Sequence, residues 1–376
     1  MSRNKSLRLH EVIGVLNSLY PPALAEDWDN VGLQVGVSDT LIDKILICLD
    51  AEESALAQAE ACAAQLVISH HPLIHRPLRR LTPADETGRV LFRAIRKNIA
   101  IVSLHTNLDR AADGLNDWLA GRLGLEQVVP LERMPGGDLI KLVVFVPAGH
   151  ETLVMDALFA AGAGQIGAYD RCSFRVFGTG SFRPGSATDP FIGRQGEAEE
   201  VEEYRLETIL PQGLVGKVVG RMLKAHPYEE VAYDLVPLQN ARHDVGLGRI
   251  GRLPQPLAVE EFFALLKQRL GLTTLRSAGP VAGEVSKIAV CGGSGASLFA
   301  EAQRQGADCL VTGDVKYHDA QRARSEGLLL IDAGHFGTEH LMVAGLAEKL
   351  RVVAADRQLP LEIIEMKTES DPFTLV

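Results

Sequence analysis

Three stretches in the first third of the chain decide the fold: KILICL at 44–49, QLVISHHP at 65–72 and AIVSLHTNLD at 100–109. Each begins with a run of apolar residues, many of them β-branched, which is typical of a buried strand. Helical spacing fills the intervals between them, at about 52–64 and 84–98. This alternation predicts right-handed βαβ units, and therefore an α/β fold with a mostly parallel sheet covered by helices.

The same alternation of strands and helices is predicted near the C-terminus. Strands are expected at 287–290, 309–312 and 328–331, and a closing strand is expected at about 359–365. The first of these leads into the glycine-rich turn CGGSGAS at 291–297. The two ends of the chain therefore have the same alternating character.

The middle of the chain predicts a separate module. Its expected strands and helices follow in the order βαββαβ, which is the order of a ferredoxin-like unit. Stretches rich in proline and glycine, MPGG at 134–137 and GLGRIGRLPQP at 246–256, bracket it. We therefore expect one α/β domain formed by residues 1–135 and 246–376, interrupted by an inserted domain at 136–245.

Composition indicates a water-soluble globular protein. The chain has 376 residues, 46% of them hydrophobic and 23% charged, which is ordinary for that class. A formal net charge of −10 argues against broad nucleic-acid binding, because neutralising phosphates requires a basic surface.

Five cysteines without a CxxC pair indicate a reducing compartment and no disulfide framework. The start of the chain lacks the apolar core of a signal peptide, and no stretch reaches the roughly 18 apolar residues of a membrane helix. We expect a cytoplasmic protein without a membrane partner.

Histidine and carboxylate side chains follow three of the predicted strands. They are His70, His71, His105, Asp109, Asp332, His335 and Glu339. In an open α/β sheet, the carboxyl ends of parallel strands meet at one edge, and ligands bind there. These side chains are therefore expected to lie close together.

Spacing strengthens this expectation. His335 and Glu339 are four residues apart, so they share one face of a helix that begins near Gly334. His70 and His71 are adjacent, and on a turn after the strand they can point toward two different ions. Imidazole suits Zn²⁺, Fe²⁺ and similar ions, and a carboxylate can bridge two cations.

Each of these residues has a plainer interpretation when taken alone: a surface histidine, a solvated ion pair on a helix, or a helix cap. Their joint occurrence at three strand ends favours a metal site. The predicted ligands of two divalent ions (Zn, Fe or Mn) are His70, His71, Asp109, His335 and Glu339.

Four further residues are candidates for supporting roles. His105 and Asp332 can orient the ligands. Asp314 and His318, within TGDVKYHDA, are candidate catalytic residues for acid–base chemistry or substrate contact, although a helix cap and a polar turn would explain them equally well.

Two other segments are expected beside the predicted metal site. Asn30 and Gln34, within WDNVGLQVG, can face the cavity that contains it. The turn at 291–297 can hold a phosphate with its backbone N–H groups, or it can be no more than a tight turn. It is not a P-loop, because GxxxxGK[ST] is missing.

Five motifs together resemble those of the NIF-three-like family, whose members are also called GTP cyclohydrolase I type 2 homologues. They are WDNVGLQVG (28–36), SHHPLI (69–74), HTNLDRAADGLND (105–117), TGDVKYHDA (312–320) and DAGHFGTEH (332–340). The resemblance covers both halves of the split domain in the expected order. The insert is similar to the PII- and CutA-like domain of longer bacterial members.

The resemblance implies a dinuclear metal site with the same five ligands. It also implies a toroidal homohexamer whose metal sites face an internal cavity, with the insert covering the openings of the ring. The name of the family implies hydrolytic opening of the guanine imidazole ring of GTP. We therefore expect a metal-dependent hydrolase that acts on a nucleotide such as GTP. The alternative is a non-enzymatic protein for metal handling or regulation.

Overall fold

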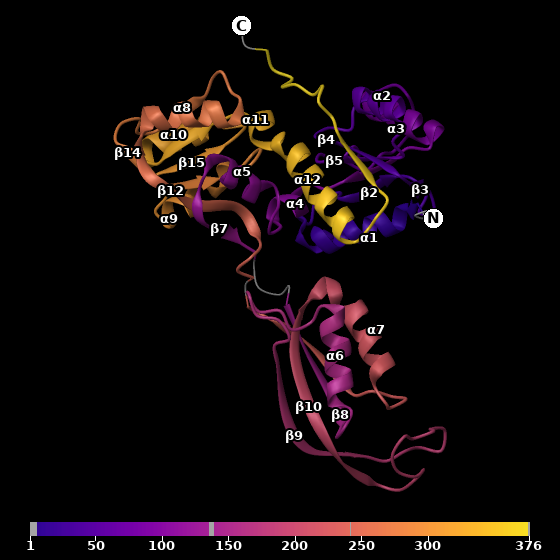
Figure 1. Cartoon of the computed structure of the whole chain (residues 1–376). Helices are drawn as coiled ribbons and strands as arrows, with labels where there is room; N and C mark the ends of the chain where they lie inside the picture. The colour runs from indigo at the N-terminus through magenta and orange to yellow at the C-terminus, as the bar shows by residue number, and fades with distance from the viewer. Residues whose placement is uncertain (1–5, 135–138, 241, 375–376) are drawn as a thin grey trace. The chain divides into compact units, whose positions relative to one another are not determined.

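The computed structural model describes residues 6–134, 139–240 and 242–374. Its contacts divide the chain into two compact units (Figure 1). The first unit combines residues 1–133 with 244–376, and we call it the two-sheet unit after its two large sheets. The second unit spans 134–243, and we call it the inserted unit. Among the described residues, no helix is both long and apolar enough to cross a membrane.

A five-stranded sheet forms the first half of the two-sheet unit. Its strands, in spatial order, are β17 (Glu362–Glu365), β4 (Lys44–Cys48), β5 (Leu66–Ser69), β6 (Ala100–Ser103) and β2 (Gly32–Val35). The first four are mutually parallel, and β2 is antiparallel to β6. Helices α2 (Glu53–Cys62) and α3 (Glu86–Lys97) pack on this sheet over an apolar core.

A six-stranded sheet forms the other half. Its strands, in spatial order, are β13 (Arg276–Ala278), β16 (Leu329–Asp332), β15 (Cys309–Thr312), β14 (Glu284–Val290), β12 (Gly246–Ala258) and β7 (Glu126–Arg133). Only β14, β15 and β16 are parallel to one another. The prediction of mostly parallel sheets is therefore wrong for this sheet. One reason is that β7 leads into the insert and β12 returns from it, so these two strands pair antiparallel. Strand β12 is also antiparallel to β14, and β13 is antiparallel to β16.

Alternate residues of this sheet enter two different cores. Val290, Val311 and Ile331 join α5 (Leu115–Leu123) and α8 (Val259–Leu270) on one face. The residues that precede them, Ala289, Leu310 and Leu330, join α9 (Phe299–Arg304) and α10 (Tyr317–Glu326) on the other face. Helix α12 (Leu341–Asp356) contacts both α5 and strands β4 and β17, so it links the two sheets.

The remaining elements of this unit are short, apart from the first helix. They are β1 (Leu7–Arg8), α1 (Leu9–Leu19), β3 (Leu41–Ile42), α4 (Thr106–Arg110), α11 (His335–Glu339), and the 3-10 turns Pro22–Leu24 and Ala296–Leu298. Two of them carry predicted ligands: Asp109 lies in α4, and α11 begins with His335 and ends with Glu339.

A buried arginine connects the two halves of the sequence within this unit. Arg249 of β12 is 1% exposed, and its guanidinium bonds both carboxylate oxygens of Asp117, at 2.6 and 2.8 Å. Its other N–H groups donate to the carbonyls of Gly246, Gly248 and Ala111. Because Ala111 is the C-cap of α4, this cluster fixes the end of the helix that carries Asp109.

The inserted unit has its elements in the order strand, helix, strand, strand, helix, strand. They are β8 (Leu139–Pro147), α6 (Glu151–Ala161), β9 (Ser173–Phe182), β10 (Glu199–Pro211), α7 (Val215–Ala225) and β11 (Tyr233–Leu238), with a 3-10 turn at Gln212–Leu214. The sheet order is β11-β8-β10-β9, and every pair is antiparallel. Helices α6 and α7 lie side by side over one face (Figure 1), where the apolar core of this unit is formed.

Candidate metal centre

The predicted ligands from the two halves of the sequence meet at one place in the two-sheet unit. His70 and His71 follow β5, and the backbone N–H groups of both donate to the Leu49 carbonyl at 3.1 Å. This fixes the turn after the strand. From the other sheet, α11 brings the Glu339 carboxylate to within 2.9 Å of His71 Nε2.

Glu339 lies at the middle of this cluster. Its side chain is almost completely buried, and the residue is 4% exposed. Oε2 lies 2.7 Å from His335 Nε2 and 2.9 Å from His71 Nε2. Oε1 faces the other way and lies 3.8 Å from His70 Nε2. The two oxygens of one carboxylate therefore face two different sets of donor atoms.

The set around Oε1 contains two buried polar atoms without a hydrogen-bond partner among the described residues, His70 Nε2 and Asp109 Oδ1. They lie 3.6 Å apart. His70 Nδ1 is 2.8 Å from the Leu104 carbonyl, and a carbonyl can only accept, so this nitrogen is the donor. In the neutral ring the lone pair is then on Nε2. Buried acceptors that face one another are stabilised by a proton, a water molecule or a cation between them, and an imidazole nitrogen beside carboxylate oxygens is a donor set that fits a metal ion.

Two carboxylates orient the histidines of the other set. Asp50 Oδ1 lies 2.8 Å from His71 Nδ1, and Asp314 Oδ2 lies 2.7 Å from His335 Nδ1. A carboxylate behind a histidine fixes the tautomer whose other nitrogen can bind a metal. Asp314 is thus a partner of a predicted ligand. Asp50 was not singled out from the sequence, although it comes directly after the strand residues KILICL and so carries the same strand-end signal.

His105 belongs to the cluster as well. Its ligand atom lies within 4.8 Å of those of His70 and His71, and the same limit holds for His71, His335 and Glu339. His105 Nδ1 is 2.9 Å from Asp29 Oδ1, which leaves its second nitrogen available. The sequence predicted only an orienting role for His105, and its partner Asp29 was not singled out.

The electrostatics of the metal-free centre follow from these contacts. Burial lowers the pKa of His71, but hydrogen bonds to Asp50 and Glu339 outweigh burial and raise that pKa to about 10. A hydrogen bond with Glu339 raises the pKa of His335 to about 9. Burial opposes ionisation of Glu339, yet its histidine partners hold the pKa of this carboxyl well below its usual range. Imidazolium protons therefore balance the buried charge when no cation does.

The glycine-rich turn at 291–297 packs against Glu339. Gly293 has φ +58°, and a Cβ at this position would overlap Glu339 Oε1. Its N–H donates to Thr338 Oγ1 at 3.0 Å, and the Gly292 N–H donates to Asn116 Oδ1 at 2.9 Å. Because these N–H groups are already bonded, the turn serves here to give the carboxylate room, which agrees with the tight-turn interpretation.

Two other predicted site residues, Asp332 and His318, lie outside the cluster of donor atoms. Asp332 accepts hydrogen bonds from the backbone N–H groups of Gly334 and Val315, at 3.0 and 3.3 Å, so it supports the loop before His335. His318 is exposed on α10, and Nδ1 lies 3.0 Å from Gln321 Oε1. No contact between His318 and the cluster is found among the described residues.

Asn30 and Gln34 fix the loop that follows the histidine pair. The Asn30 amide donates to the Ile74 carbonyl at 2.7 Å, and the Gln34 amide oxygen accepts from the Ile74 N–H at 3.2 Å. Their contacts therefore hold the chain after His71 in place.

A cleft of about 1230 Å³ gives access to one side of the centre. His71 and His335 line it together with the carboxylates that orient them. Three arginines, Arg122, Arg269 and Arg276, also line this cleft. Arg276 is ion-paired with Asp332, and Asp371 also lines the cleft, so both signs of charge lie next to the histidines.

The contact between Gly293 and Glu339 yields a prediction. Gly293→Ala should displace the Glu339 carboxylate and weaken metal binding by roughly tenfold or more. Gly306→Ala is the matched control, because Gly306 has φ +70° and open space around it. Both variants carry similar backbone strain, so only the first should lose metal in a competition titration with a chelator. Equal losses in both variants would contradict the role assigned to Gly293.

Comparison with known proteins agrees with the motifs. The chain matches the family model described as Duf34/NIF3 (NGG1p interacting factor 3) over residues 7–372. It is 41% identical over 365 residues to a GTP cyclohydrolase 1 type 2 homolog of Halalkalibacterium halodurans, covering 97% of this chain and 98% of that protein. A homolog of the same name from Bacillus subtilis is 38% identical, covering 99% of this chain and all of that protein.

A solved structure, that of a Bacillus cereus protein related to NIF3, superposes with a TM-score of 0.90 at 39% identity. The match covers 99% of this chain and 100% of that one. The family resemblance inferred from the five motifs is thus confirmed over nearly the whole length. The chain belongs to the Duf34/NIF3 (NGG1p interacting factor 3) family.

Proposed function

We propose that this protein holds two divalent metal ions and acts as a metal-dependent hydrolase on a nucleotide or a related small molecule. The observation that carries the proposal is the division of the donor atoms by Glu339. One half-site consists of His70 Nε2, Asp109 Oδ1 and Glu339 Oε1. The other consists of His71 Nε2, His335 Nε2 and Glu339 Oε2. A carboxylate between two such sets is suited to bridge two ions.

The residues around the half-sites have separate tasks. Asp50 and Asp314 keep Nε2 of His71 and of His335 directed at the second half-site. Arg122 and Arg269 line the cleft beside it, and guanidinium groups bind phosphate oxygens through paired hydrogen bonds. A bound metal pair supplies an activated water near neutral pH and stabilises charge on the reacting oxygens.

The names of the relatives support a reaction of the GTP cyclohydrolase type, in which hydrolysis of the guanine imidazole ring releases formate. Asp314 and His318 were candidates for acid–base chemistry. The hydrogen bond to His335 favours an orienting role for Asp314, and His318 would need to reach the cleft from the surface of α10. We therefore assign proton transfer to the centre itself and leave His318 as a candidate for substrate contact.

Burial of the first half-site favours a second candidate function, which is metal handling or regulation without turnover. His70 is 0% exposed, so an ion held there would be shielded from solvent and would exchange slowly. Retention of metal together with absence of turnover of any nucleotide would select this alternative.

Three expectations about organisation form part of the proposal. The first is a toroidal homohexamer, and the second is a cytoplasmic location. The third is a ferredoxin-like inserted unit of the PII and CutA type. The last is supported by the antiparallel order β11-β8-β10-β9, which is fourth, first, third and second along the unit.

The ligand assignment predicts metal content variant by variant. Elemental analysis of untagged protein should give roughly two ions per chain, and His71→Ala roughly one. Glu339→Ala should lose most of both, because it removes the bridge. His318→Ala is the control and should keep the wild-type content. Unchanged content in the His71 and Glu339 variants would contradict the assignment. Formate release from GTP that follows the metal content across the wild type, His71→Ala and Glu339→Ala would support the cyclohydrolase reaction.

The raised pKa values predict that metal binding depends on pH. At pH 7 the metal-free protein carries protons on His71, with a pKa of about 10, and on His335, with a pKa of about 9. Metal ions must displace them, so binding should release protons. Apparent affinity for Zn²⁺ should therefore rise from pH 6.5 toward pH 9. Calorimetry in two buffers with different ionisation enthalpies measures the release. A binding enthalpy that is independent of the buffer would contradict the prediction.

A further inference from the structure

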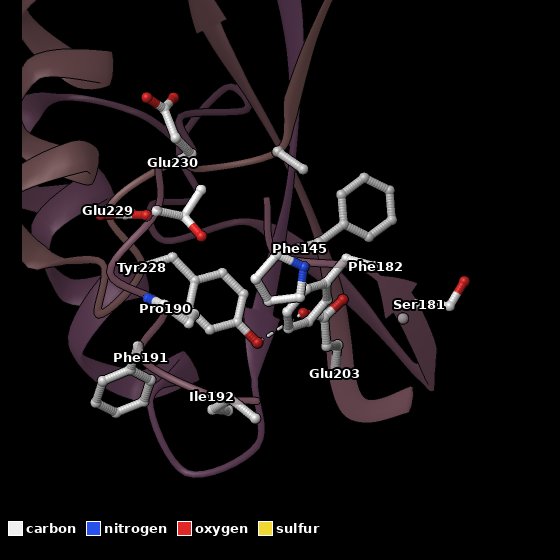
Figure 2. A pocket seen from close by; sticks show the side chains of 14 residues that line it. Phe145, Ser181, Phe182, Pro190, Phe191, Ile192, Glu203, Tyr228, Glu229 and Glu230 are labelled. Atoms are coloured by element: carbon white, nitrogen blue, oxygen red, sulfur yellow. Dashed lines mark hydrogen bonds between the residues drawn. The ribbon is translucent and has the colours of Figure 1, made fainter. Parts of the chain in front are cut away.

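The inserted unit contains a pocket of about 400 Å³ whose lining includes four aromatic side chains. Phe145 of β8 and Phe182 of β9 line it, together with Phe191 and Tyr228 from the loops. The Tyr228 ring centre lies 6.1 Å from that of Phe182 and 6.2 Å from that of Phe191. Figure 2 shows Tyr228 among these rings. The volume lies in the range of small-molecule sites, about 300–1,000 Å³.

A carboxylate lies within this aromatic group. Glu203 of β10 is 8% exposed, and Oε1 accepts a hydrogen bond of 3.0 Å from the Tyr228 hydroxyl, drawn as a dashed line in Figure 2. Gly180 of the neighbouring strand makes room for it, because a Cβ there would overlap Glu203 Oε2. Burial and the nearby Glu203 raise the pKa of Tyr228, so the phenol stays protonated and remains a donor.

The charge of the pocket is one-sided. Its lining residues include three glutamates, Glu203, Glu229 and Glu230, and no lysine, arginine or histidine. No ion pair to Glu203 is found among the described residues; its hydrogen-bond donor is the neutral phenol of Tyr228. A buried carboxylate is costly unless a positive charge balances it. The faces of aromatic rings also attract cations, more strongly where water is excluded.

We propose that this pocket binds a small organic cation, an ammonium group attached to an apolar or aromatic body. The ammonium group pairs with the Glu203 carboxylate, and the body packs among Phe145, Phe182 and Tyr228. Phe191, whose side chain is exposed, closes the outer wall. The inserted unit thereby gains a ligand of its own. This site uses none of the metal ligands, so its test is independent of the proposed hydrolase.

The test compares two probes on the full-length protein. Phenethylammonium carries the proposed charge, and 2-phenylethanol has a similar shape without it. Titration calorimetry should show saturable binding of the ammonium probe, and the alcohol should bind at least about tenfold more weakly, because it lacks the charge-assisted hydrogen bond. Absence of saturable ammonium binding, or equal binding of both probes, would overturn the proposal.

Two variants with the same change of charge locate the site. Glu203→Gln should weaken ammonium binding about tenfold or more. Glu202→Gln is the control, because Glu202 is the exposed neighbour on the same strand and does not line the pocket. Equal affinities of the two variants would overturn the assignment of the cation to Glu203.

A second pair covers the case in which Glu203→Gln does not fold. Phe191→Ala removes an exposed ring from the pocket wall, and Phe177→Ala removes an exposed ring of β9 that lies outside the lining. Neither ring is part of the buried core of the unit. Only Phe191→Ala should weaken binding of phenethylammonium. Equal binding by the two alanine variants would overturn the proposal.

Discussion

The two-sheet unit depends on the accommodation of one buried carboxylate, that of Glu339. A negative charge that is 4% exposed is costly, and removing its positive partners would cost several kcal/mol. The surrounding structure offsets this cost with histidine partners and leaves space for the carboxylate. His71 and His335 contact one oxygen, and His70 faces the other. Gly293 lacks the side chain that would exclude this carboxylate from its position.

The contacts of Glu339 bring together residues from the two ends of the sequence. His70, His71 and Asp109 come from the first half of the unit, and His335 and Glu339 come from the second. The donor set is therefore complete only when both sheets are formed and packed through α5 and α12. Arg249 and Asp117 make a second connection between the two halves, through two hydrogen bonds from the guanidinium to the carboxylate. Among the described residues, those of the inserted unit contribute no side chain to this cluster, which agrees with their contacts forming a unit of their own.

Much of this arrangement could be predicted from local signals. The strand expected at 44–49 is β4 (Lys44–Cys48), and the helix expected near Gly334 is α11, which begins at His335. Both follow from patterns within a few residues, namely apolar runs and i,i+4 spacing. Because strand ends and helix faces are local properties, the histidines and carboxylates that the structure brings together could be selected before any packing was known.

What could not be predicted depends on contacts between distant residues. The antiparallel pairing of β7 with β12 joins strands more than a hundred residues apart, on either side of the insert. The partnership of Asp314 with His335 depends on how two loops meet, so the sequence alone left Asp314 as an acid–base candidate. The contact between Gly293 and Glu339 likewise required the packed structure, since CGGSGAS alone fits a phosphate-binding turn and a tight turn equally well.

The most direct measurement of the central claim is a crystal structure of metal-loaded protein, with anomalous diffraction recorded at the absorption edge of the bound metal. Two anomalous peaks should flank the Glu339 carboxylate, roughly 3.5–4 Å apart. One peak should lie beside His70 and Asp109, and the other beside His71 and His335. A single peak, or two peaks that do not share Glu339, would contradict the bridged centre described here.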